Sequence, residues 1–163
     1  MNPLSITRIN LVSPYSVWHD KGLYYFKTKA DILLAIEFEV DETLTFEGSY
    51  WLNLINFTGK HSPSDPGVKR TVITIIEEFF RSNPSVLLYL CDTRDNQQAM
   101  RSRLFMRWFD ESDTKESFFI KVAEVKDEET INYVAIIVQR SNPEAKTILE
   151  QFNREIELFQ QKP

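Results

Sequence analysis

Hydrophobic residues recur at every second position in the first part of the chain, a period that predicts β-strands. The clearest alternation is at Ile32, Leu34, Ile36, Phe38 and Val40, which predicts one strand. A shorter apolar segment at Tyr24–Thr28 precedes it and predicts the first strand of a hairpin. The aromatic-rich YWLNLINF at 50–57 predicts a third strand. Together the three segments predict an antiparallel meander.

The hydrophobic period then changes to that of a helix. Asp65 suits the capping position, Pro66 suits the first helical position, and Pro84 ends the helix at its far end. One face of this helix carries Val68, Val72, Ile75, Ile76 and Phe79. The continuous apolar run SVLLYLCD follows and predicts a central strand buried on both faces.

The remaining elements complete the predicted fold. A second helix begins at Asp95, with Gln98 completing a capping box, and SFFIKVAEV and NYVAIIVQR flank the turn KDEET as a hairpin. A final helix starting at Asn142–Pro143 places one apolar stripe at Ala145, Ile148, Leu149, Phe152, Ile156 and Phe159. The order β-β-β-α-β-α-β-β-α predicts a single α+β domain over 1–163, with helices on a mainly antiparallel sheet and a less regular segment at 1–20.

One charge falls on the apolar face of the helix that begins at Asp95. With about 100° of turn per residue, the face that includes Met100 and Trp108 is centred about 90° from Met100, and Arg101 lies on that line. Arg103 and Arg107 fall on the opposite, polar side. Because an arginine cannot lose its proton there, Arg101 requires carboxylates or carbonyls nearby.

Two interpretations of Arg101 stay open. In the first, it forms a buried ion pair with Asp92, Glu77 or Glu78 and fixes the helix on the sheet. In the second, Asp92, Arg101 and Trp108 line a pocket at the strand end, where the guanidinium holds an anionic ligand by a bidentate contact. The residues alone do not decide whether the protein is an enzyme.

The charge pattern argues against nucleic acid as a partner. The net charge is -5, and acidic residues interrupt the possible basic stripe of Arg94, Arg103 and Arg107. No stretch reaches the roughly 18 apolar residues of a membrane span, and MNPLSITRIN lacks the pattern of a signal peptide. We therefore expect no membrane association and a cytoplasmic location.

The residues that could do chemistry are few. With a single cysteine and two histidines, the sequence predicts neither a disulfide nor a metal site. Cys91 has no evident base to activate it, which favours a core residue, and His61 with Asp65 could form a general-base pair, although a solvated side chain beside a helix cap is the simpler interpretation. The four glycines form no phosphate-binding loop.

The sequence resembles two families. The segments VKRTVITIIEEFF, LLYLCDTRDNQQAMRSRLFMRWF and NYVAIIVQRSNP are similar to a family of small uncharacterised bacterial proteins, a domain of unknown function without known activity. The order of strands and helices is similar to that of GNAT-type N-acetyltransferases, and Asn96, Ala99 and Phe105 match their Asn-x-x-Ala and aromatic pattern. That resemblance implies coenzyme A or acetyl-CoA as cofactor, bound at a Gly-rich helix start, for which HSPSDPGVKRT offers only Gly67.

Two functional hypotheses follow. The first is a non-catalytic binding or protein-interaction domain without a cofactor, which forms a homodimer or binds another protein through exposed members of the large aromatic set. The second is a divergent acyl-CoA-dependent N-acyltransferase with Asp92, Arg101 and Trp108 around its pocket. The first predicts a concentration-dependent mass, and the second predicts stabilisation by coenzyme A.

Overall fold

The structure is a computed structural model that describes residues 1–42, 48–60, 64–91, 107, 115–127 and 130–160. Its strands are β1 (Trp18–Asp20), β2 (Leu23–Lys27), β3 (Leu33–Val40), β4 (Ser49–Asn56), β5 (Val86–Cys91), β6 (Phe118–Asp127) and β7 (Thr130–Gln139). Its helices are α1 (Ile6–Val12), α2 (Pro66–Ser82), the 3-10 helix η1 (Lys115–Ser117) and α4 (Ala145–Gln160).

Within the described residues the strands form a seven-stranded sheet in the order β1-β2-β3-β4-β5-β7-β6. The pairs β1–β2, β2–β3, β5–β7 and β6–β7 are antiparallel. The predicted α+β class and mainly antiparallel sheet are therefore confirmed. The chain separates into two compact units, Met1–Glu39 with Leu52–Pro84 (unit 1) and Val40–Trp51 with Ser85–Pro163 (unit 2).

Two turns fix the register of the strands in unit 1. Lys21 and Gly22 both have positive φ, 48° and 82°, which is the backbone of the two-residue turn that matches the twist of a hairpin. Between β2 and β3, the Thr28 hydroxyl accepts hydrogen bonds from the backbone N–H groups of Ala30 and Ile32 at 3.3 and 3.2 Å. These turns align β1, β2 and β3 without a slip, so the face on which each side chain lies is settled.

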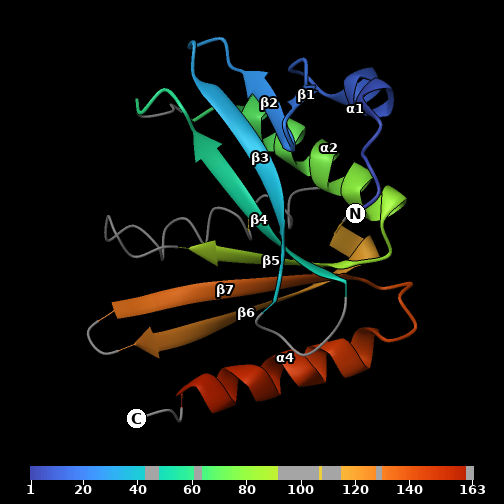
Figure 1. Ribbon diagram of the computed structural model, residues 1–163, viewed down its shortest axis with the longest axis vertical. Coiled ribbons are helices and arrows are strands. Elements are labelled where there is room, and N and C mark those ends of the chain that lie inside the picture. The colour runs from blue at the N-terminus through green and yellow to red at the C-terminus, as the bar shows by residue number, and fades with distance from the viewer. Residues whose placement is uncertain (43–47, 61–63, 92–106, 108–114, 128–129, 161–163) are drawn as a thin grey trace. The chain divides into compact units, whose positions relative to one another are not determined.

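The core of unit 1 lies between this part of the sheet and α2, which runs behind β2 and β3 in Figure 1. The predicted face of α2 is confirmed, since Val68, Val72, Ile75, Ile76 and Phe79 are all buried. The ring of Phe79 stacks on that of Phe38 of β3, with centroids 4.6 Å apart. Burial of such side chains, at about 1.5–3 kcal/mol each, holds α2 on the sheet.

In unit 2, α4 lies along β6 and β7 (Figure 1). Its buried residues Ala145, Ile148 and Phe152 pack in one cluster with Leu88 of β5 and Ile136 of β7. The predicted hairpin of the last two strands is confirmed, with Phe118 opposite Gln139 at one end. The pairing continues to Asp127 opposite Thr130, so the strands extend into the segment KDEET that was predicted as the turn.

The structure corrects the prediction at several ends. The segment 1–20, predicted to be less regular, contains α1 and β1, which are too short to show a hydrophobic period. The final helix begins at Ala145, and Phe159 near its end is 46% exposed, so it does not belong to the buried stripe. In β5, Leu87 and Leu88 are fully buried as predicted, but Leu90 is 47% exposed. The predicted burial on both faces therefore does not extend to the end of the strand.

Candidate functional site

The predicted pocket of Asp92, Arg101 and Trp108 lies outside the described residues, so it stays a prediction. Cys91 is the last residue of β5. Within 92–114 the structure describes Arg107, which is helical and exposed, in agreement with its predicted place on the polar side. The functional surfaces that can be built from geometry are therefore in other parts of the chain.

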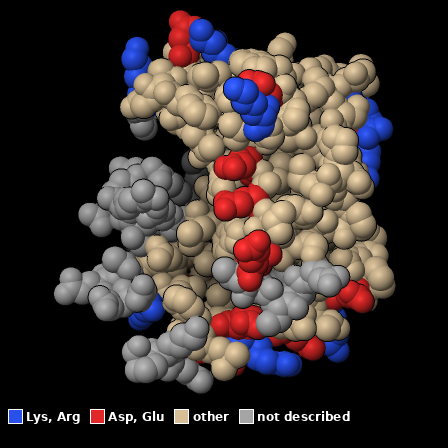
Figure 2. All heavy atoms as spheres, viewed as in Figure 1, with Lys and Arg blue, Asp and Glu red and all other residues tan. Residues whose placement is uncertain are grey.

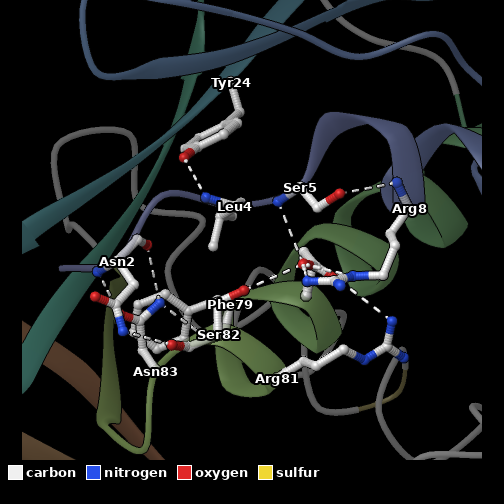
Figure 3. Close-up of polar contacts among 10 residues, drawn as sticks. Asn2, Leu4, Ser5, Arg8, Tyr24, Phe79, Arg81, Ser82 and Asn83 are labelled. Carbon is white, nitrogen blue, oxygen red and sulfur yellow. Dashed lines mark hydrogen bonds and ion pairs between the residues drawn. The ribbon is translucent and has the colours of Figure 1, made fainter.

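A buried carboxylate is the centre of a polar cluster in unit 1. The side chain of Glu78 on α2 is 3% exposed, and Arg8 of α1 donates to it from Nε at 3.1 Å and from Nη2 at 2.6 Å. Its Oε1 also accepts from the Ser5 backbone N–H at 3.2 Å and from the Ser82 hydroxyl at 3.1 Å. Arg81 adds a contact from Nη1 to Oε2 at 3.4 Å (Figure 3).

The charge of Glu78 is maintained by these donors. Burial raises the pKa of Glu78, but the hydrogen bonds from Arg8, Ser5 and Ser82 outweigh it and hold the pKa below its ordinary value. Glu78 was one of three predicted partners of Arg101. Among the residues that the structure describes, its ionic partners are Arg8 and Arg81, so within these residues the cluster is a structural ion pair.

The same region attaches the N-terminal segment to both α2 and the sheet. The backbone N–H of Asn2 donates to the Asn83 side chain at 2.7 Å, and the Leu4 N–H donates to the Tyr24 hydroxyl of β2 at 3.3 Å. Figure 3 shows this segment passing between Tyr24 and the end of α2. The first residues of the chain therefore bridge the helix and the strand.

Helix α1 is in turn hydrogen-bonded to the residue before β1. The Asn10 side chain accepts from the Val17 backbone N–H at 2.8 Å and donates to the Val17 carbonyl at 2.9 Å. This pair of bonds imitates a strand partner for the residue immediately before Trp18. Sequence reasoning missed α1, although Ser5 caps it by accepting from the Arg8 N–H at 3.2 Å, because Ile9 is the one residue of its seven that is buried.

Three aromatic rings from different segments form a continuous row on the sheet face opposite α2. Trp18 of β1 stacks on Tyr25 of β2 at 5.6 Å between centroids, and Tyr25 contacts Phe57, which follows β4, at 5.6 Å. Trp18 is 44% exposed and Phe57 is 50% exposed. We call Trp18, Tyr25 and Phe57 the aromatic row, an apolar surface open to solvent.

Carboxylates lie beside the aromatic row on the same face. The register places Asp20 and Glu37 on either side of Leu23, two positions along β2 from Tyr25. The side-chain amide of Asn53 donates to Glu37 at 3.5 Å and to Glu39 at 3.2 Å. Asp20, Glu37 and Glu39 form what we call the acidic strip. Figure 2 shows acidic side chains, in red, among tan ones on this side of unit 1.

The start of α2 is occupied by a tyrosine and a carboxylate. Asp65 caps the helix, as predicted, by accepting from the Gly67 N–H at 2.8 Å, and it also accepts a hydrogen bond from the Tyr15 hydroxyl. The bond from Tyr15 lowers the pKa of Asp65, whereas the carboxylate raises the pKa of Tyr15. The N–H of Gly67, in the segment that the GNAT resemblance compares with the pyrophosphate loop, is therefore already bonded.

The histidines contribute no recognisable site to this part of the chain. The ring of His19 lies 4.6 Å from that of Tyr24, and His61 is outside the described residues. No three His, Cys, Asp or Glu side chains in the described ranges are grouped so that they could hold a metal ion. No helix among these residues is both long and apolar enough to span a bilayer.

A comparison with models of protein families finds a match. A model of a family of unknown function, DUF6169, matches residues 64–154, from the residue before the cap of α2 to within α4. A search of curated proteins finds no match. The aromatic row and the acidic strip precede the matched region, which covers more than half of the 163 residues. The chain therefore belongs to the family of unknown function DUF6169.

Proposed function

We propose that this protein is a non-catalytic protein-interaction domain that binds through the aromatic row. The observation that carries this proposal is the exposure of two large rings, Trp18 and Phe57, on either side of Tyr25. Aromatic side chains bury much area at a small cost in conformational entropy, which is why they are enriched at the centres of protein interfaces.

The aromatic row is fixed before any partner arrives. The turn at Lys21 and Gly22 sets Trp18 opposite Tyr25, and the Asn10 side chain holds the adjacent Val17. A surface that is already ordered loses little freedom on association, so more of its contact energy is available for binding. This preorganisation supports a binding role for the face.

The partner that this surface favours is a different protein, not a second copy. In a homodimer formed through the same face, the acidic strips of the two copies would come close together, and like charges across an interface oppose association. We propose a cytoplasmic location for this interaction, since one cysteine in the chain gives no sign of a disulfide framework.

The experiment is a binding assay against labelled peptides of basic, neutral and acidic composition, combined with sedimentation at several protein concentrations. Trp18→Ala and Phe57→Ala are the test variants, and Phe159→Ala is the matched control because Phe159 is exposed to a similar extent, 46% against 50% for Phe57. We expect saturable binding of at least one class, weakened by about tenfold in the test variants and unchanged in the control. The absence of binding to every class, together with a constant mass, would overturn the proposal.

A further inference from the structure

We infer that the partner of the aromatic row is an extended protein segment that carries lysine or arginine two positions from an apolar residue. This inference rests on the proposed function and names the class of its partner. It follows from the charge of the acidic strip and from its spacing along the strands.

The register determines that spacing. Tyr25 pairs with Trp18 on one side and Ala35 on the other, whereas Leu23 pairs with Asp20 and Glu37. Because Leu23 and Tyr25 are two residues apart on one strand, Asp20 and Glu37 of the acidic strip lie about 7 Å from the aromatic row, and Glu39 lies two residues further along β3. An extended segment repeats its side chains on one side at the same interval, so one residue can contact the rings while the next on that side reaches the carboxylates.

The charge of this face is negative with little compensation. Lys27 lies on the same side of β2 as Tyr25, but its ammonium group is 3.6 Å from Asp31. Asn53 supplies amide hydrogen bonds to Glu37 and Glu39 and no positive charge, so it orients these carboxylates without neutralising them. A cation on the partner, two positions from a residue on the rings, would meet Asp20 and Glu37, with Glu39 beyond them.

Other partners fit this arrangement less well. Nucleic acid would bring phosphates to the carboxylates, and an acidic segment would be repelled in the same way. A purely apolar segment could cover the aromatic row, but it would bring no cation to the carboxylates of the acidic strip. A basic extended segment satisfies both features together.

The test uses fluorescence polarisation with peptides that differ only in pattern. A Leu-Ser-Lys-Ser repeat places leucine and lysine on one side of an extended chain, whereas a Leu-Lys-Ser-Ser repeat of equal charge places them on opposite sides. A Leu-Ser-Gln-Ser repeat is the neutral comparison. We expect the first peptide to bind about tenfold more tightly than the other two, and more weakly as salt rises.

The protein variants separate this inference from the proposed function. Glu37→Gln with Glu39→Gln should abolish the preference for the lysine peptide, about tenfold. The control Glu144→Gln with Glu150→Gln removes the same charge from exposed positions of unit 2 and should retain the preference. Urea melts of each variant check that the fold is intact.

Each alternative outcome has a definite meaning. Equal binding of the glutamine and lysine peptides, weakened by Trp18→Ala but not by the Glu37 and Glu39 changes, would overturn the basic partner and leave the proposed function standing. A mass that depends on protein concentration, and no longer does so in Trp18→Ala, would identify a second copy as the occupant. This result would also overturn the basic partner. Peptide binding that neither Trp18→Ala nor Phe57→Ala affects, or no binding at all, would overturn both.

Discussion

Replacing Glu78 tests whether the buried ion pair holds the N-terminal segment in place. Glu78→Ala removes the acceptor of the Ser5 N–H and the Ser82 hydroxyl. Both donors are half-buried, so each one left without a partner costs about 1–2 kcal/mol, the lower part of the range for a fully buried donor. The arginines add less than in a fully buried pair, since the Arg8 and Arg81 side chains are 50% and 59% exposed and can be hydrated. We therefore expect a loss of about 2–4 kcal/mol in the free energy of unfolding.

Glu78→Gln refines the test because it keeps an acceptor oxygen but removes the charge. We expect a smaller loss of about 1–2 kcal/mol at neutral pH. Because the folded-state pKa of Glu78 is depressed, its charge stabilises the fold above the ordinary carboxyl pKa of about 4.3, and this stabilisation is lost as the pH falls through the lower folded value. The difference between Glu78→Gln and the parent should therefore shrink as the solution is acidified.

The assay is urea unfolding followed by circular dichroism, at neutral pH and at a series of pH values below about 4.3. Glu150→Gln on the exposed side of α4 is the control and should change stability by no more than about 0.5 kcal/mol. Hydrogen exchange of residues 2–17 should become faster in the Glu78 variants. A Glu78→Gln variant as stable as the parent at neutral pH, or less stable by the same amount at every pH, would refute the argument.

Three further predictions concern other parts of the chain. Gly67→Ala should destabilise by about 1–3 kcal/mol in thermal melts, despite the better helix propensity of alanine, because its Cβ would lie 2.8 Å from the Tyr15 ring; a stabilised variant would contradict this. Arg101→Ala should lower the free energy of unfolding by about 3–5 kcal/mol if it leaves a buried carboxylate without a partner. Arg103→Ala should lower it by no more than about 0.5 kcal/mol. Equal small losses in urea melts would show that the predicted helical phase is wrong. A thermal-shift titration with coenzyme A and acetyl-CoA, with adenosine diphosphate as control, should show no specific stabilisation if the protein is an interaction domain. A stabilisation of about 2.7 kcal/mol at a ligand concentration of 100 times the dissociation constant would favour the transferase hypothesis.

The elements that the sequence predicts correctly are those with strong local signals. Helix α2 has a cap at Asp65, a proline at Pro66 and an apolar face that is buried in the structure. The β6–β7 hairpin likewise follows from two long alternating segments around a polar turn. In these cases the local pattern and the tertiary packing agree, so the pattern is sufficient.

The candidate surface depends on information that no local pattern contains. Trp18 belongs to a strand of three residues, and its place beside Tyr25 follows from the turn at Lys21 and Gly22. That Lys-Gly pair was a signal that could have revealed β1 from the sequence. Without β1, the sequence shows that the chain is rich in aromatic residues, but it does not show that Trp18, Tyr25 and Phe57 lie side by side.

Glu78 was named from the sequence as one possible partner of a buried Arg101, but its pairing with Arg8 was missed for a similar reason. It lies at the edge of the apolar face of α2, where a glutamate is ordinarily exposed to solvent. Its main partner, Arg8, is 70 residues earlier in the chain and belongs to the helix that was not predicted. A charge whose burial depends on so distant a residue cannot be found from helical phase alone.

The buried cluster and the exposed row are connected through α1. Glu78 holds Ser5 and Arg8 at the start of this helix, and Asn10 within the same helix holds Val17, the neighbour of Trp18. Since α1 has seven residues, too few to be stable alone, its position depends on these contacts at its two ends. The ion pair at Glu78 therefore acts on the aromatic row indirectly, by fixing the helix that holds β1 and keeps Trp18 stacked on Tyr25.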